Sequence, residues 1–238
     1  MSGTGVLLLL IFISALPVIL AILWFRLSRF PLSLLRCLCA LLAGAAALFP
    51  ALLLQRLFLA LMSGPGGYEG RWGPMVRMFG RIALTEELSR LLALFVFFLM
   101  AGDFKKTYPL YPERNRDRGP AGTGGMGAAA WGSAAGLLAG LGFSIVENAA
   151  YGAADFRLAL PRTFITAPLH GACGARIGSA LLTGKERPRS AVFRFFSAVL
   201  IHGVYNAMIA RAGISVPLGV LIALFALASS VLEIRGGQ

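Results

Sequence analysis

The sequence is poor in charged residues. Only 13% of its 238 residues are Asp, Glu, Lys or Arg, whereas 58% are hydrophobic, and the mean hydropathy is +0.78. Because soluble domains carry about 25% charged residues, this composition excludes a soluble globular protein. Most of the chain must have lipid as its solvent. Since one helical crossing needs about 20 apolar residues, we expect about six to eight crossings in a single membrane-embedded domain over residues 1–238.

Cysteine and histidine are also scarce. The three cysteines, Cys37, Cys39 and Cys173, lie in apolar stretches and allow neither a disulfide framework nor a CxxC metal pair. We interpret them as small buried hydrophobic residues. The two histidines do not form an HExxH motif, so that type of zinc site is excluded.

Acidic residues are few, and the basic excess of +12 is spread between the apolar runs. This distribution is typical of membrane topology rather than of a nucleic-acid surface, so we expect no nucleic-acid partner. No basic residue precedes the first apolar run and no A-x-A-like cleavage site follows it. We therefore expect a retained first span and not a cleaved signal peptide.

The apolar stretches predict an all-α, polytopic transmembrane bundle of about seven helices. They cover residues 5–25, 34–62, 82–101, 127–154, 160–183, 191–210 and 214–233. We expect an interfacial or re-entrant connection at Ser63–Arg81, which is rich in Gly, Pro and aromatics, and a surface loop at Asp103–Gly125. Glycines at four-residue spacing predict close helix packing: Gly132, Gly136 and Gly140 in one helix, Gly174 and Gly178 in the next.

The positions of the basic residues predict the orientation. Thirteen Lys and Arg lie in the first, third and fifth connections and the C-terminal tail, and six lie on the opposite side. Because cytoplasmic loops retain basic residues, we expect the N-terminus outside and the C-terminus in the cytoplasm.

Ionisable residues inside the predicted spans are the main functional signal. Each charge would cost roughly 2.5–3.5 kcal/mol alone at the bilayer centre, so these residues must face one another or water. They include both histidines and three of the ten carboxylates: Glu86, Glu87, Arg90, Glu147, His170, Arg176 and His202.

Spacing and depth place most of these residues together. Glu86 and Arg90 are four residues apart, as are Glu147 and Tyr151, and His202 and Asn206, so each pair shares a helix face. With alternating topology and a rise of about 1.5 Å per residue, the glutamates and both histidines all reach the outer half of the membrane. We predict a single site there.

The residue types of this site indicate hydrolysis. Glu147, His170 and His202 match a His₂Glu set that holds a catalytic Zn²⁺, with Glu86 or Glu87 as the general base. The same groups could act without metal, with Glu and His activating water and Asn206 or Arg90 stabilising the oxyanion. The sequence leaves both mechanisms open.

Other interpretations give these residues a purely structural role or assign the protein to another functional class. Glu86, Glu87 and Arg90 could form only a buried ion pair, and the cluster could relay ions in a transporter, although its members share one depth instead of crossing the membrane. A non-catalytic membrane scaffold and bis-His haem ligation are further alternatives, and haem leaves the glutamates unexplained. We expect Arg176 to snorkel to the cytoplasmic side. The acidic residues in or beside loops are expected to be solvated: Asp103, Glu113, Asp117, Asp155 and Glu186.

Four motifs resemble, in order and spacing, those of the PrsW family of intramembrane proteases, which is related to the CAAX prenyl proteases and Abi-type membrane proteins. They are ALTEELSR (83–90), GFSIVENAAYG (142–152), TAPLHGACGARIG (166–178) and IHGVYNAM (201–208). The resemblance covers a core of about 80–210. The chain has EExxR where the more distant relatives show EExxxR, and no Phe four residues before His170.

The resemblance implies a membrane endopeptidase of a bacterial cytoplasmic membrane. The implied substrate is a single-span membrane protein, such as an anti-sigma factor, cut near its extracytoplasmic side. Residue by residue, the implied glutamate pair is Glu86 and Glu87, the Glu of the EN motif is Glu147, and the two histidines are His170 and His202. The family is grouped with metallopeptidases, which implies a metal, whereas the prenyl proteases imply a metal-free use of Glu and His.

Overall fold

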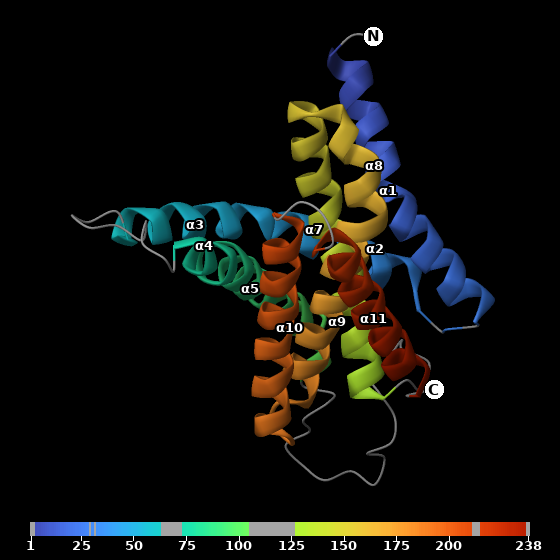
Figure 1. Ribbon diagram of the computed structural model, residues 1–238. Coiled ribbons are helices and arrows are strands. Elements are labelled where there is room, and N and C mark those ends of the chain that lie inside the picture. Colours follow the sequence, from blue (N-terminus) through green and yellow to red (C-terminus); the bar gives the residue numbers. More distant parts are fainter. Residues whose placement is uncertain are drawn as a thin grey trace, which may run out of the picture.

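The computed structural model describes residues 3–28, 30, 32–62, 73–104, 127–210 and 215–236, and in these ranges the regular structure is entirely helical (Figure 1). Five helices are long and apolar enough to cross a membrane: Thr4–Leu27, Leu34–Met62, Ala128–Ala154, Pro188–Ile209 and Val216–Gly236. The all-α polytopic prediction is confirmed, and the chain is an integral membrane protein.

Two further helical runs fill the remaining predicted spans. One joins α4 (Gly73–Met75), the π-helical η1 (Val76–Leu84) and α5 (Thr85–Met100). The other joins α8 (Ala159–Pro161), the π-helical η3 (Arg162–Thr166) and α9 (Ala167–Thr183), after the short 3₁₀ turn η2 (Phe156–Leu158). With α1 (Gly3–Leu27), α7 (Ala128–Ala154), α10 (Pro188–Ile209) and α11 (Ser215–Gly236), these runs agree with about seven helices.

The second predicted span bends. A turn at Ala47 divides residues 34–62 into α2 (Leu34–Ala46) and α3 (Leu48–Met62), and Figure 1 shows α3 leading sideways from the upright bundle of α7, α9 and α10. Helical structure begins at Gly73, inside the connection predicted at Ser63–Arg81. Residues 63–72 and 105–126 lie outside the described part of the chain.

The helix ends follow local chemistry. The Ser33 hydroxyl accepts the backbone N–H of Arg36 at 3.3 Å and so caps α2. Asp155 ends α7 in extended conformation, and its carboxylate accepts the N–H of Arg157 at 3.0 Å. Proline at the first position of α10, Pro188, suits a helix start because no intrahelical N–H is lost there.

Helix α7 is the centre of the bundle. Of its most apolar window 83% is buried, compared with 17–28% in the other four candidate spans, so it contacts protein where the others contact lipid. Its glycines meet α9: a Cβ atom on Gly136 would overlap the Gly174 carbonyl, and one on Gly140 would overlap the His170 carbonyl. The predicted close packing is confirmed, and it sets the position of His170.

Two predictions about charged residues are wrong. Asp103 is not solvated but fully buried, where it accepts a hydrogen bond from Trp131 Nε1 at 2.9 Å and lies 3.5 Å from Arg36 Nη1. Arg176 does not snorkel, because its guanidinium is held by the α11 hydroxyls of Ser229 (2.6 Å) and Ser230 (3.1 Å). Asp155 and Glu186 are exposed as predicted, whereas Glu113 and Asp117 lie outside the described residues.

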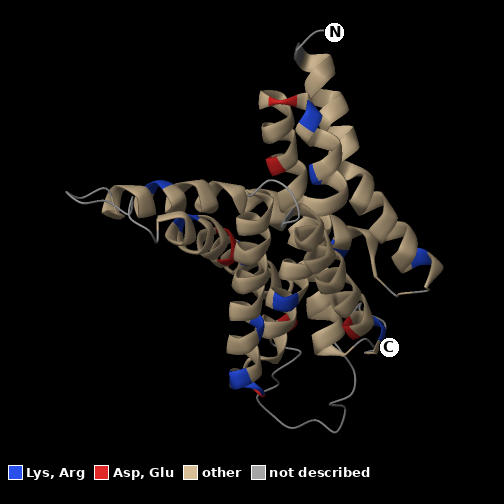
Figure 2. Ribbon diagram, in the orientation of Figure 1, with Lys and Arg blue, Asp and Glu red and all other residues tan. Residues whose placement is uncertain are grey.

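Charged positions are sparse along the helices, and many lie near helix ends (Figure 2). The predicted orientation stays a prediction, since part of the basic residues counted for it lies outside the described ranges. Inside the bundle, the charged groups of α5 and Glu147 of α7 form the site together with the histidines of α9 and α10.

Candidate active site

Four helices bring the predicted site residues together. The first turns of α5 supply Glu86, Glu87 and Arg90, α9 supplies His170, and α10 supplies His202, all buried. The two imidazole rings lie edge to face with centroids 5.0 Å apart. Glu147 joins them from α7.

The backbone is unusual next to this cluster. The π-helical η1 ends at Leu84, two residues before the glutamate pair, and η3 ends at Thr166, one helical turn before His170. π-Helical segments are rare and occur frequently at functional sites, because they re-aim the side chains that follow. The two segments therefore mark the helices that carry the site.

The α5 glutamate Glu87 fixes the orientation of His202. Its Oε1 atom lies 2.7 Å from His202 Nδ1 and 2.8 Å from Arg90 Nη2. An ionised carboxylate only accepts, so Nδ1 carries a proton, and in a neutral ring Nε2 keeps its lone pair. That Nε2 atom lies 3.8 Å from Glu86 Oε2. A carboxylate behind the imidazole is the arrangement that orients metal-binding histidines.

The tautomer of His170 follows from Arg90. Arg90 Nη2 lies 3.0 Å from His170 Nδ1, and Arg90 Nη1 donates to the His170 carbonyl at 3.3 Å. Because a guanidinium has only donors, Nδ1 accepts and a neutral ring carries its proton on Nε2. His170 Nε2 then donates to Glu147 Oε2 at 2.9 Å. For Nε2 to bind a metal, its proton must move to Nδ1, which requires the Arg90 guanidinium to turn away from Nδ1, and the hydrogen bond to Glu147 must break.

Glu147 lies at the partly exposed edge of the cluster. Its side chain is 13% exposed, whereas those of Glu87, Arg90 and His170 are fully buried. Arg162 Nη2 donates to its Oε2 at 2.7 Å, and Arg162 Nε donates to Asn148 Oδ1 at 3.0 Å. Sequence reasoning counted Arg162 only as a loop charge. The sequence does hold a signal for this contact. Arg162 stands at the start of the helix that follows the Glu147 helix, so the two residues lie near the same end of adjacent helices.

Glu86 has one oxygen without a hydrogen bond among the described residues. Gln55 Nε2 donates to Oε1 at 3.1 Å, but Oε2 forms no hydrogen bond with the described residues, and the same holds for Oε2 of Glu87. An unsatisfied buried polar group costs about 1–3 kcal/mol, so these oxygens call for a cation or water. Gln55 was missed because it lies within an apolar stretch with no motif around it.

A metal ion fits this cluster. Ligand atoms of Glu86, His170 and His202 lie within 4.8 Å of one another. One carboxylate and two imidazoles are a donor set that metalloenzymes use, and Glu86 Oε2, which lacks a hydrogen bond, lies 3.8 Å from His202 Nε2. The geometry groups Glu86 with the imidazoles, whereas the sequence prediction grouped Glu147 with them.

Asn206 is the predicted residue that the geometry does not join to the cluster. It is half-buried one turn after His202, and its side chain forms none of the hydrogen bonds found among the described residues. Its neighbour Tyr205 instead shares a 2.8 Å hydrogen bond with Thr166, which ties α10 to the helix of His170.

A family model agrees with this site. The model described as PrsW family intramembrane metalloprotease matches residues 31–230, which contain every member of the buried cluster. Comparisons with curated proteins and with solved structures gave no match. The matched segment is most of the chain and includes the core expected at 80–210. The chain therefore belongs to the PrsW family of intramembrane metalloproteases.

Proposed function

We propose that the cluster of Glu86, Glu147, His170 and His202 hydrolyses a peptide bond of a single-span membrane protein near the extracytoplasmic face. The observation that supports this most is the convergence of ligand atoms of Glu86, His170 and His202 within 4.8 Å of one another, beside the partly exposed Glu147. This arrangement joins a carboxylate within reach of water to a set of buried metal-binding groups, as hydrolysis requires.

In this proposal Glu86, His170 and His202 hold a zinc ion. Zinc suits one carboxylate and two imidazoles and keeps a further position open in catalytic sites. When bound, it would acidify a water molecule and polarise the scissile carbonyl. A metal-free mechanism uses the same glutamates and histidines, and the metal measurements below separate the two.

Glu147 is the general base. It takes the proton of the attacking water and returns it to the leaving amine. Sequence reasoning placed this role on Glu86 or Glu87. The Oε1 atom of Glu87 is already engaged by His202 and Arg90 and its side chain is fully buried, which favours a positioning role.

Two arginines hold the acidic groups in place. Arg90 contacts Glu87 and His170 together, so it fixes α5 against α9. Arg162 holds Glu147 by an ion pair of 2.7 Å at the partly exposed edge, where it can also stabilise the oxyanion. Asn206 is assigned a supporting polar role on the same face of α10 as His202.

Depth supports cleavage near a membrane surface. Glu147 precedes the end of α7 at Ala154 by seven residues, a rise of about 10 Å. The charge count predicts that this end of α7 is extracytoplasmic. A substrate with a single span, such as an anti-sigma-like protein, would present its juxtamembrane bond at this depth.

The proposal is tested by mapping new N-termini in membranes of cells that express the full chain. Wild type should generate neo-N-termini at extracytoplasmic juxtamembrane positions of single-span proteins. Glu147→Gln and His202→Ala should lose them at equal protein level, because the base or a ligand is gone. Glu186→Gln, an exposed control, should retain them. Identical termini in wild type and both site variants would refute the proposal.

A further inference from the structure

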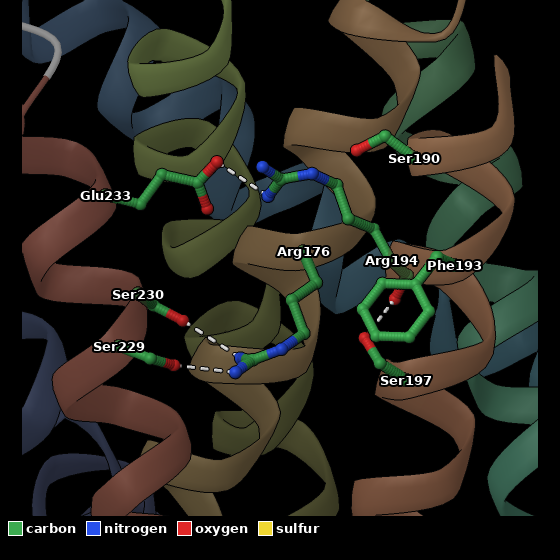
Figure 3. Close-up of a pocket in the computed structure, with 8 residues that line it drawn as sticks. All are labelled: Arg176, Ser190, Phe193, Arg194, Ser197, Ser229, Ser230 and Glu233. Carbon is green, nitrogen blue, oxygen red and sulfur yellow. Dashed lines mark hydrogen bonds and ion pairs between the residues drawn. The ribbon is translucent and has the colours of Figure 1, made fainter. Parts of the chain in front are cut away.

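A polar cavity lies between α9, α10 and α11, near the end of the bundle opposite Glu147. Its volume is about 340 Å³, and Figure 3 shows the side chains that line it. Serines and arginines predominate: Arg176, Ser190, Phe193, Arg194, Ser197, Ser229, Ser230 and Glu233. A polar cavity in a membrane bundle calls for a polar occupant.

Cationic charge exceeds anionic charge in this cavity. Arg194 is paired with Glu233, with 2.6 Å between Nη1 and Oε1. Arg176 donates only to neutral oxygens, those of Ala172, Ala226, Ser229 and Ser230, and no carboxylate of the described residues lies within ion-pair distance of it. One positive charge is therefore left without a counter-ion, which favours an anionic ligand.

An apolar groove continues from the cavity. It encloses about 410 Å³ between α10 and α11 and shares Arg176 with the polar cavity. Along α11 its lining runs from Ala226, at the middle of the helix, back to Leu218 near the helix start, which is about 12 Å of helix rise away from the polar cavity. The remaining wall is hydrophobic: Ile201, Met208, Leu221, Ile222 and Phe225.

We propose that the cavity and groove together bind an anionic phospholipid. The phosphate group contacts Arg176 and Arg194 in the polar cavity, and one acyl chain lies in the groove. A cationic cavity that opens into an apolar groove matches an amphiphile with a charged headgroup and a hydrocarbon chain, whereas a soluble anion would need the cavity alone. Charge complementarity selects an acidic headgroup.

This site is separate from the proposed hydrolytic cluster. The groove lies on the α11 side of α10 at Ile201, whereas the adjacent His202 faces Glu87 of α5. Loss of lipid binding and loss of cleavage can therefore be observed independently.

Native mass spectrometry of the full chain in detergent tests the proposal with phosphatidylglycerol and phosphatidylcholine as probes. Wild type should bind phosphatidylglycerol more tightly. Arg176→Gln and Arg194→Gln should each weaken that binding by about tenfold, the effect of losing one charge-assisted contact. Arg189→Gln, an exposed neighbour outside the cavity, is the matched control and should bind as wild type.

A variant in the apolar groove tests the proposal independently of the arginines, whose substitution could prevent folding. Leu221 is 60% exposed, so Leu221→Trp should fold while its ring occupies the groove and weakens phosphatidylglycerol binding. The proposal is overturned if the folded variants all bind phosphatidylglycerol as wild type does. It is also overturned if phosphatidylcholine binds equally well, or if millimolar inorganic phosphate displaces the lipid.

Discussion

Replacing Glu87 by Ala should destabilise the fold by about 3–5 kcal/mol, the cost of leaving one member of a buried ion pair without its partner. In the structure Glu87 Oε1 receives Arg90 Nη2 at 2.8 Å and His202 Nδ1 at 2.7 Å, and both Glu87 and Arg90 are fully buried. The other α5 carboxylate near Arg90 is that of Glu86, whose Oε2 lies 3.7 Å from Arg90 Nη2. The substitution thus leaves the buried Arg90 guanidinium with only the more distant Glu86 carboxylate as counter-ion. It also removes the hydrogen bond that orients the His202 ring.

The assay is reversible unfolding of the purified protein in mixed micelles, followed for wild type, Glu87→Ala and Glu147→Gln. Glu147 is partly exposed and keeps its hydrogen bonds as Gln, so Glu147→Gln should change stability by less than about 1 kcal/mol and still lose cleavage. A loss below about 1 kcal/mol in Glu87→Ala would refute the positioning role argued from the contacts.

Three further substitutions test the packing and the site. Gly140→Val should push the His170 carbonyl away from α7 and cost about 1–3 kcal/mol, as overpacking does, measured by the same unfolding assay. Arg162→Gln should reduce the cleavage rate by about tenfold or more through loss of the charged contact to Glu147, measured as neo-N-terminus yield at matched expression. Tyr205→Phe should lose about 1 kcal/mol of stability with cleavage retained, because it removes a hydrogen bond outside the cluster.

The sequence predicted the helices and the buried cluster because both follow from the cost of placing groups in lipid. Apolar length determines the spans, and charge inside a span requires a partner, which brought Glu86, Glu87 and His202 to one site. The α7 glycines showed the closest helix pair for a similar reason, since small residues permit contact of backbones.

The remaining features depend on contacts across helices that spacing does not encode. Arg162 and Arg176 were assigned by distance from a span end, yet one pairs with Glu147 and the other with the serines of α11. Asp103 stood beside a loop and proved buried against Trp131. The bend at Ala47 has a signal in the sequence, because Pro50 cannot donate a backbone hydrogen bond to Ala46, yet the apolar run was predicted as one straight span.

The most direct test of the metal site is the zinc content of the purified chain, determined by elemental analysis together with cleavage before and after chelation. The account predicts about one zinc per chain, lost with activity on chelation and absent from Glu86→Ala and His202→Ala. Cys39→Ser, which removes an exposed thiol, should keep the zinc. Full cleavage by a metal-free chain, or unchanged zinc in both ligand variants, would contradict the account.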